Sequence, residues 1–129
     1  MELKTNAFII KKINWKESSQ IIHAFNDKFG FCSFIAKGIR KDKHSDHEIM
    51  QLFNEVELIL SVHENSELST LKSVSLILAN LNNNFKTIAI KTSAIELLQN
   101  LIINPEDLNL VYTHLKKFFI YLENNNNKQ

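Results

Sequence analysis

Hydrophobic and polar positions alternate along the first 80 residues in the manner of β-strands. The clearest alternation lies in residues 55–63, where Val56, Leu58, Leu60 and Val62 are separated by polar, charged or apolar residues of the opposite face. Because successive side chains of a strand point to opposite faces, this pattern predicts a strand with one buried face. Apolar and β-branched segments predict four more strands, at residues 6–13, 20–25, 31–37 and 68–78.

Turn residues and a break in the alternation predict how these strands connect. Asn26 and Gly30 favour a hairpin between the second and third strands. In the fifth strand the apolar phase changes between Leu71 and Val74, which indicates a β-bulge. A long connection, residues 38–52, follows the third strand and holds a short helical turn in its second half. This order predicts a mainly β fold with α, a five-stranded Greek-key barrel of the oligonucleotide/oligosaccharide-binding (OB) type.

Apolar residues recur at every third or fourth position after residue 84, which is typical of amphipathic helices. The first helix is predicted from a stripe that we expect to be buried: Phe85, Ile88, Ala89, Thr92, Ile95, Leu98, Leu101 and Ile102. Asn104 and Pro105 then favour a new helix start. The second stripe consists of Leu108, Val111, Tyr112, Leu115, Phe118, Phe119 and Leu122. Together they predict an antiparallel two-helix α-hairpin packed on the barrel.

These patterns divide the chain into an OB-fold domain at residues 1–80, a helical hairpin at 81–123 and a disordered Asn-rich tail at 124–129. A length of 129 residues with 44% hydrophobic residues allows a buried core. Cys32 is the single cysteine, so we expect an inert core thiol in a reducing, cytoplasmic setting. We find no signal peptide and no apolar run of the ~20 residues that a membrane span needs.

Charge is distributed unevenly, although the formal net charge is only +1. Residues 1–45 carry nine basic and four acidic side chains, a net charge of +5, and the remainder carries −4. Four of the basic residues fall within seven positions after the third predicted strand: Lys37, Arg40, Lys41 and Lys43. This concentration favours a polyanion as partner, with a plain solvated loop as the alternative.

The sequence contains no catalytic motif, and two glycines are too few for a phosphate-cradling loop. We therefore predict that the protein is not an enzyme and needs no cofactor. His44, Asp46 and His47 have a spacing that could approach a metal ion. This ligand set is too small for a typical site, so we predict no metal centre.

The basic loop carries the functional prediction. Lys37, Arg40, Lys41 and Lys43 are expected to bind DNA, because each cation that neutralises a phosphate releases a bound counterion. Arg40 is the only arginine of the chain, and its planar guanidinium suits bidentate phosphate contacts.

Residues beside the first strand could extend this interface. Lys11, Lys12 and Lys16 border the strand and could lengthen the groove. Trp15 could stack a base, or it could close one end of the core instead.

The order of motifs in residues 4–78 resembles the bacterial recombination mediator family RecO. The motifs are Lys16-Glu17-Ser18 after an aromatic residue, Ala36-Lys37-Gly38-Ile39-Arg40 after a strand, "MQLF" at 50–53 and "ELSTL" at 67–71. The resemblance implies an N-terminal OB fold followed by part of a helical domain. It implies binding to single- and double-stranded DNA, annealing of complementary strands, and cooperation with RecR and single-stranded DNA-binding protein (SSB) in loading RecA.

Family members continue with further helices, and their contact with SSB lies there, so we do not carry that partner over to this shorter chain. Two functions remain. The first is a non-enzymatic, cytoplasmic and nucleoid-associated DNA-binding protein of recombinational repair. The alternative is a protein-interaction module that has lost productive DNA binding and docks on a RecR-like or other partner, because a short helical part leaves an apolar face uncovered.

Overall fold

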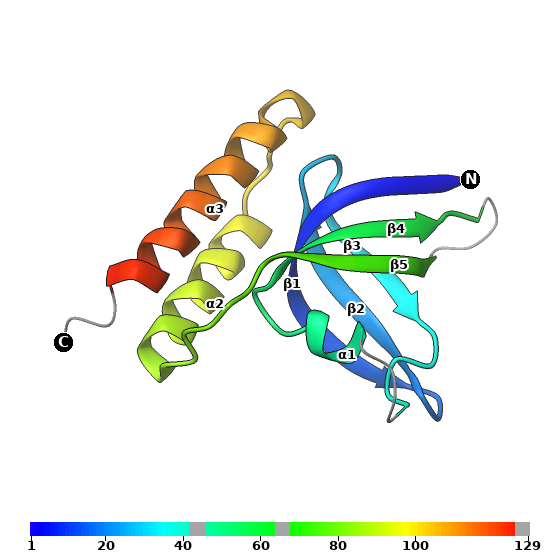
Figure 1. Cartoon of the computed structure of the whole chain (residues 1–129). Helices are drawn as coiled ribbons and strands as arrows, with labels where there is room; N and C mark the ends of the chain where they lie inside the picture. The colour runs from blue at the N-terminus through cyan, green and yellow to red at the C-terminus, as the bar shows by residue number, and fades with distance from the viewer. Residues whose placement is uncertain (42–45, 64–67, 126–129) are drawn as a thin grey trace.

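The computed structural model describes residues 1–41, 46–63 and 68–125. Five strands form a closed barrel in the order β1-β2-β3-β5-β4 (Figure 1). The strands are β1 (Glu2–Trp15), β2 (Ser19–Asn26), β3 (Gly30–Ala36), β4 (Glu55–Ser61) and β5 (Ser69–Leu78). The helical elements are α1 (Asp46–Ile49), α2 (Phe85–Gln99), the 3-10 turn η1 (Pro105–Asp107) and α3 (Leu108–Asn125). The predicted five-stranded barrel followed by two helices is confirmed.

The barrel closes because β1 is long enough to pair with two partners. Its first half pairs antiparallel with β4, from Glu2 opposite Ser61 to Phe8 opposite Glu55. Its second half pairs with β2, and a register shift between Ile9 and Lys11 bends the strand there. Among the strands that the structure describes, only β3 and β5 pair in parallel. The polar residues at both ends of β1 hid this length from the apolar pattern, which predicted residues 6–13 alone.

The bulge predicted in the fifth strand is present. Ile59 of β4 lies opposite Ser73, whereas the next residue, Leu60, lies opposite Leu71. Lys72 is therefore the extra residue, and it changes which face the following side chains occupy. As a result both Leu71 and Val74 pack against the barrel core.

Two apolar clusters hold the molecule together. The first fills the barrel and consists of Ala7, Ile9, Ile22, Ala24, Phe34, Ala36, Ile39, Met50, Val56, Leu58 and Leu60. The second joins the barrel to the helices and is rich in aromatic rings. In it, the ring of Phe8 lies 5.1 Å from Phe119 and 5.2 Å from Tyr112, measured between centroids. Edge-to-face and tilted ring pairs of this kind fix one docking geometry for the helices.

Helices α2 and α3 lie side by side and run in opposite directions beside one end of the barrel (Figure 1). On α3 the predicted stripe is largely correct, since Leu108, Tyr112, Leu115, Phe119 and Leu122 are buried. This helix continues through Asn125, two residues into the predicted tail, and residues 126–129 lie outside the described residues. Among the described residues, no helix combines the length and apolar character needed to cross a membrane.

The buried stripe predicted for α2 is wrong in part. Phe85 is 89% exposed and Ile102 is 99% exposed, and Ala89, Thr92 and Leu101 are exposed as well. The helix buries Thr87, Lys91 and Ile95 instead. Its sequence is apolar on more than one side, so periodicity alone did not identify the inner face.

The side chain of Lys91 explains the choice of face. Its Nζ donates to Asn80 Oδ1 at 2.5 Å and to Glu123 Oε1 at 2.9 Å. The same ammonium group lies 5.1 Å from the centroid of the Phe119 ring. A buried cation is tolerated when it is paired and hydrogen-bonded, and these partners meet that condition.

Candidate nucleic-acid interface

Along strands β1, β2 and β3, every second side chain points to the outside of the barrel. Lys11 lies opposite His23, which lies opposite Ser33, and Ile13, Ile21 and Ile35 form the next row. Directly opposed residues share a face of the sheet. We call this surface the outer face, and it consists of Lys11, Ile13, Trp15, Ser19, Ile21, His23, Phe31, Ser33 and Ile35. The residues between them, such as Ile22 and Phe34, fill the barrel.

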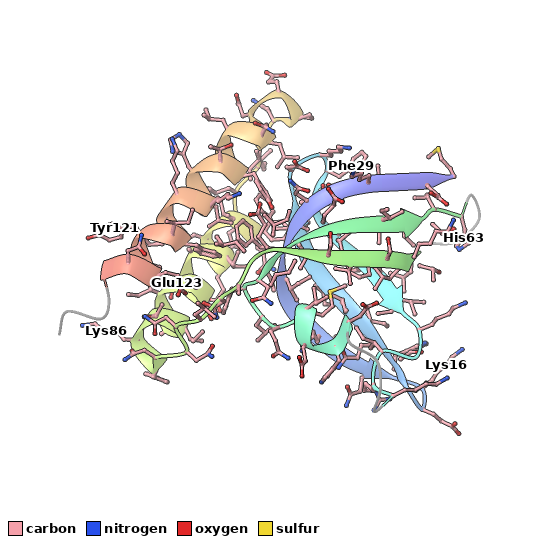
Figure 2. The ribbon with its side chains drawn as sticks, in the orientation of Figure 1. Lys16, Phe29, His63, Lys86, Tyr121 and Glu123 are labelled. Carbon is pink, nitrogen blue, oxygen red and sulfur yellow. The ribbon has the colours of Figure 1, made fainter. Side chains whose placement is uncertain are left out.

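The outer face ends at the turn that joins β1 to β2, where Lys16 is labelled in Figure 2. Lys16 has a left-handed backbone, with φ 55. Arg40 holds this turn from the following loop: its Nη2 donates to the Lys16 carbonyl at 2.6 Å and its Nε donates to the Ser19 carbonyl at 3.1 Å. The backbone N–H of Arg40 also donates to the Ser18 carbonyl at 2.9 Å.

Two of the five side-chain N–H donors of Arg40 thus bind main-chain carbonyls. Neither contact neutralises its charge, because carbonyls are uncharged. Within the described part of the chain, no carboxylate forms an ion pair with Arg40. The residue therefore shapes the turn and keeps its positive charge there.

A hollow of about 410 Å³ lies beside the turn and gathers several of the predicted residues. Trp15, Lys16, Lys37 and Lys41 line it together with Gly38 and small polar side chains. We call this the tip hollow. Lys16, Lys37 and Lys41 are exposed, and none forms an ion pair with a carboxylate of the described residues.

Trp15 lies at the edge of the tip hollow. Its side chain is 43% exposed, and its contact with a base stays a prediction. The Nζ of Lys16 lies 6.0 Å from the centroid of the indole ring. An exposed ring beside a cation is suited to stacking on a base whose phosphate is neutralised nearby.

The remaining predicted residues lie elsewhere. Lys11 is at the opposite end of the outer face, near α2. Lys12 lies directly opposite the fully buried Ile22 and so faces the barrel side of β1, where burial lowers the pKa of its ammonium group. The structure does not bring Lys12 to the outer face, and Lys43 lies outside the described residues.

Sequence reasoning missed the uncharged part of the surface. Phe31, His23 and Ser33 all lie on the outer face, and Ser33 Oγ and His23 Nδ1 are 2.6 Å apart. The signal was present, because the hairpin turn at Asn26 and Gly30 fixes which residues of the two strands share a face. Combining that register with the alternation of β1 identifies the surface.

A larger pocket of about 720 Å³ lies where the outer face meets α2. The barrel contributes Phe31, His23 and Ser33 to it, and α2 contributes Thr92, Glu96 and Gln99. We call it the joint pocket.

Cys32 also borders the joint pocket and packs against the barrel core. Burial raises the pKa of its thiol, and a hydrogen bond with Asn26 lowers it by less. The thiol therefore stays protonated at neutral pH, which agrees with the predicted inert group.

The metal-ligand candidates lie partly beyond what the structure describes. Asp46 and His47 are in α1, and His44 lies outside the described residues. Within the ranges that are described, no three His, Cys, Asp or Glu side chains gather in the manner of a metal site.

The barrel region matches a known protein family. Residues 1–79 match the family described as "Recombination protein O N terminal". Two curated proteins, both named DNA repair protein RecO, are similar to the chain. The one from Prosthecochloris aestuarii is 34% identical over 68 residues, 53% of this chain and 26% of the relative. The one from Mesoplasma florum is 30% identical over 86 residues, 66% of this chain and 31% of the relative. The chain thus matches less than a third of the length of either relative.

Proposed function

The chain belongs to the RecO family of DNA repair and recombination proteins, and from this premise we propose that it is a non-enzymatic protein that binds single-stranded DNA along its outer face. Binding to duplex DNA, annealing of complementary strands, cooperation with a RecR-like protein and mediation of RecA loading in the cytoplasm belong to the same proposal. Annealing requires no catalytic group, because two strands pair spontaneously once their charge is screened and they are held close.

The observation that carries the proposal is the tip hollow. Three exposed lysines and an exposed indole converge there, although they come from two segments about 20 residues apart. OB barrels bind single strands across this face of the sheet and its flanking loops. Exposed aromatic rings stack on bases, and cations beside them neutralise the phosphates. These contacts are not specific for base sequence, because the phosphates are the same at every nucleotide.

A salt series of fluorescence anisotropy with a labelled oligonucleotide tests this. Five described cations belong to the interface: Lys11, Lys16, Lys37, Arg40 and Lys41. At about −0.7 per neutralised phosphate, the log–log salt slope for a single strand is about −3.5, so affinity falls about 100-fold between 50 and 200 mM salt. The double variant Lys37→Glu/Lys41→Glu should bind weakly and reduce the magnitude of the slope by at least 1.4, about 0.7 for each lost contact.

The matched control is Lys86→Glu/Lys117→Glu, which changes the net charge equally on exposed positions of α2 and α3. This control should keep most of the affinity and the slope of the wild type. The proposal is wrong if the two double variants bind equally, because net charge rather than the tip hollow would then govern binding.

A second function has one observation in its favour. The hairpin exposes large apolar side chains to solvent, among them Phe85, Leu97 and Ile102. Exposed apolar groups of this size are typical of protein-interaction surfaces. The alternative is therefore an interaction module that docks on a RecR-like or other protein, and it predicts little DNA binding at any salt concentration but a larger mass on sizing with that partner.

A further inference from the structure

We propose that the joint pocket is a subsite for a nucleobase that carries an exocyclic amino group, with Glu96 as the hydrogen-bond acceptor. The inference rests on the proposed function and makes it more specific, since it names which part of the strand enters and which bases are preferred.

The position of the joint pocket suits one end of a bound strand. The outer face runs from the tip hollow to α2, and the helix crosses it there with Thr92, Glu96 and Gln99. A strand that follows the face cannot continue straight past the helix, so its next base must turn into the pocket or out to solvent. A volume of about 720 Å³ lies within the usual range for small-molecule sites.

The charges at the pocket favour a base over a phosphate. Glu96 places a carboxylate on the helix side, which would repel a phosphate group. Among the described residues no cation pairs with this carboxylate, and no N–H or O–H donates to it. Lys11 lines the part of the joint pocket that the barrel contributes. Its ammonium group can neutralise the phosphate of the bound nucleotide, which remains outside the pocket.

The polar groups at the pocket match the edge of a base. Phe31 offers an exposed ring for stacking, and the hydrogen-bonded pair of His23 and Ser33 lies beside it. A carboxylate accepts a hydrogen bond from the amino group of cytosine, and adenine and guanine also carry such groups. Thymine has no exocyclic amino group, and its one ring donor, N3–H, lies between two carbonyl oxygens that would repel the Glu96 carboxylate. We therefore expect cytosine to be preferred to thymine.

Oligo(dC) and oligo(dT) of equal length provide the direct test. They carry the same number of phosphates, so the contacts of the tip hollow are the same for both. Wild type should bind oligo(dC) at least about 10-fold more tightly, the lower end of the range for one hydrogen bond to a charged acceptor, because Glu96 is exposed. Glu96→Ala should reduce this ratio to about one. Glu106→Ala is the charge-matched control, because Glu106 is exposed on η1 and does not line the pocket, and it should keep the ratio.

A second pair of variants tests the pocket by filling it. Thr92→Trp places a large ring at the mouth and should remove the preference for oligo(dC). Ser93→Trp adds the same ring at the neighbouring exposed position, which does not line the pocket, and should keep the preference. Both changes are on the exposed side of α2, and circular dichroism shows whether each variant is folded.

The outcomes separate the two proposals. Salt-dependent binding with equal affinity for oligo(dC) and oligo(dT), or a ratio unchanged by both Glu96→Ala and Thr92→Trp, overturns the base subsite and leaves the DNA-binding function intact. Absence of salt-dependent binding to either oligonucleotide overturns both.

Discussion

Replacement of Tyr112 by phenylalanine tests the link that joins the barrel to the helices. The hydroxyl of Tyr112 on α3 donates to Glu55 Oε2 on β4 at 2.7 Å, and both residues are buried. The other carboxylate oxygen, Oε1, is 2.8 Å from the Nζ of Lys116. Tyr112→Phe removes one donor and leaves the ring in place, so its contacts with Phe8 and Phe25 remain.

The size of the effect follows from the charge of the acceptor. A hydrogen bond to a charged group contributes about 1.5–3 kcal/mol to stability, more than a bond between neutral groups. Lys116 still pairs with the carboxylate after the change, but its side chain is 37% exposed and solvent screens the pair. We therefore expect Tyr112→Phe to lower the free energy of unfolding by about 2 kcal/mol at pH 7.

The same contact predicts how the loss depends on pH. Burial raises the pKa of the Tyr112 phenol, and the hydrogen bond and charge of Glu55 raise it further. Above the ordinary value of 10.0 the unfolded chain releases this proton while the folded protein keeps it. The stabilisation is therefore complete below pH 10 and declines above it, by up to about 1.4 kcal/mol per pH unit. The phenylalanine variant lacks this decline, so the difference between the two proteins should vanish near pH 11.4.

Urea denaturation followed by far-UV circular dichroism, from pH 7 to pH 11, measures both quantities. His114→Gln is the control, since His114 is exposed on the same helix, α3. It should change stability by less than about 0.5 kcal/mol. The reasoning is refuted if Tyr112→Phe behaves like this control at pH 7, or if the difference between variant and wild type stays constant above pH 10.

Two other substitutions test the contacts of Arg40 and Lys91. Arg40→Lys cannot reproduce the two side-chain hydrogen bonds to the Lys16 and Ser19 carbonyls, so we expect thermal denaturation to show a loss of stability of about 1 kcal/mol. An unchanged melting temperature would contradict the role of Arg40 in holding the turn between β1 and β2. Lys91→Met leaves the Glu123 carboxylate without its buried cation and should cost about 3 kcal/mol in urea denaturation. Adding Glu123→Gln should recover part of that loss, whereas an additive double variant would show that the pair is not coupled.

The barrel could be predicted because its strands obey a simple rule. Val56, Leu58 and Leu60 alternate with other residues, and the phase change after Leu71 marked the bulge that the structure contains. The first residues of β1 could not be predicted, because their pairing partners in β4 lie about 50 residues away. The inner face of α2 was also hidden, since nothing local shows that Lys91 finds a carboxylate 32 residues later.

The candidate site was predicted by charge and missed where charge was absent. Lys37 and Lys41 drew attention because they are close together in sequence, and the structure places them with Trp15 at the tip hollow. Phe31 and His23 were not predicted as site residues, because a phenyl or imidazole ring in a strand can equally belong to the buried core until the strand register is known. The two side-chain contacts of Arg40 cross 21 and 24 residues of sequence, so only the folded chain shows that this residue shapes a turn.

Strand β1 is synthesised before the other strands of the barrel, yet half of its backbone partners are synthesised much later. Its hairpin with β2 can form as soon as Asn26 has emerged, whereas the seam with β4 waits for Ser61 and for the Val62 N–H that donates to the Met1 carbonyl at 2.8 Å. Contacts between segments so distant in the chain form slowly, because a long loop must close first. The nascent chain therefore exposes the open sheet edge of β1 until β4 has been synthesised.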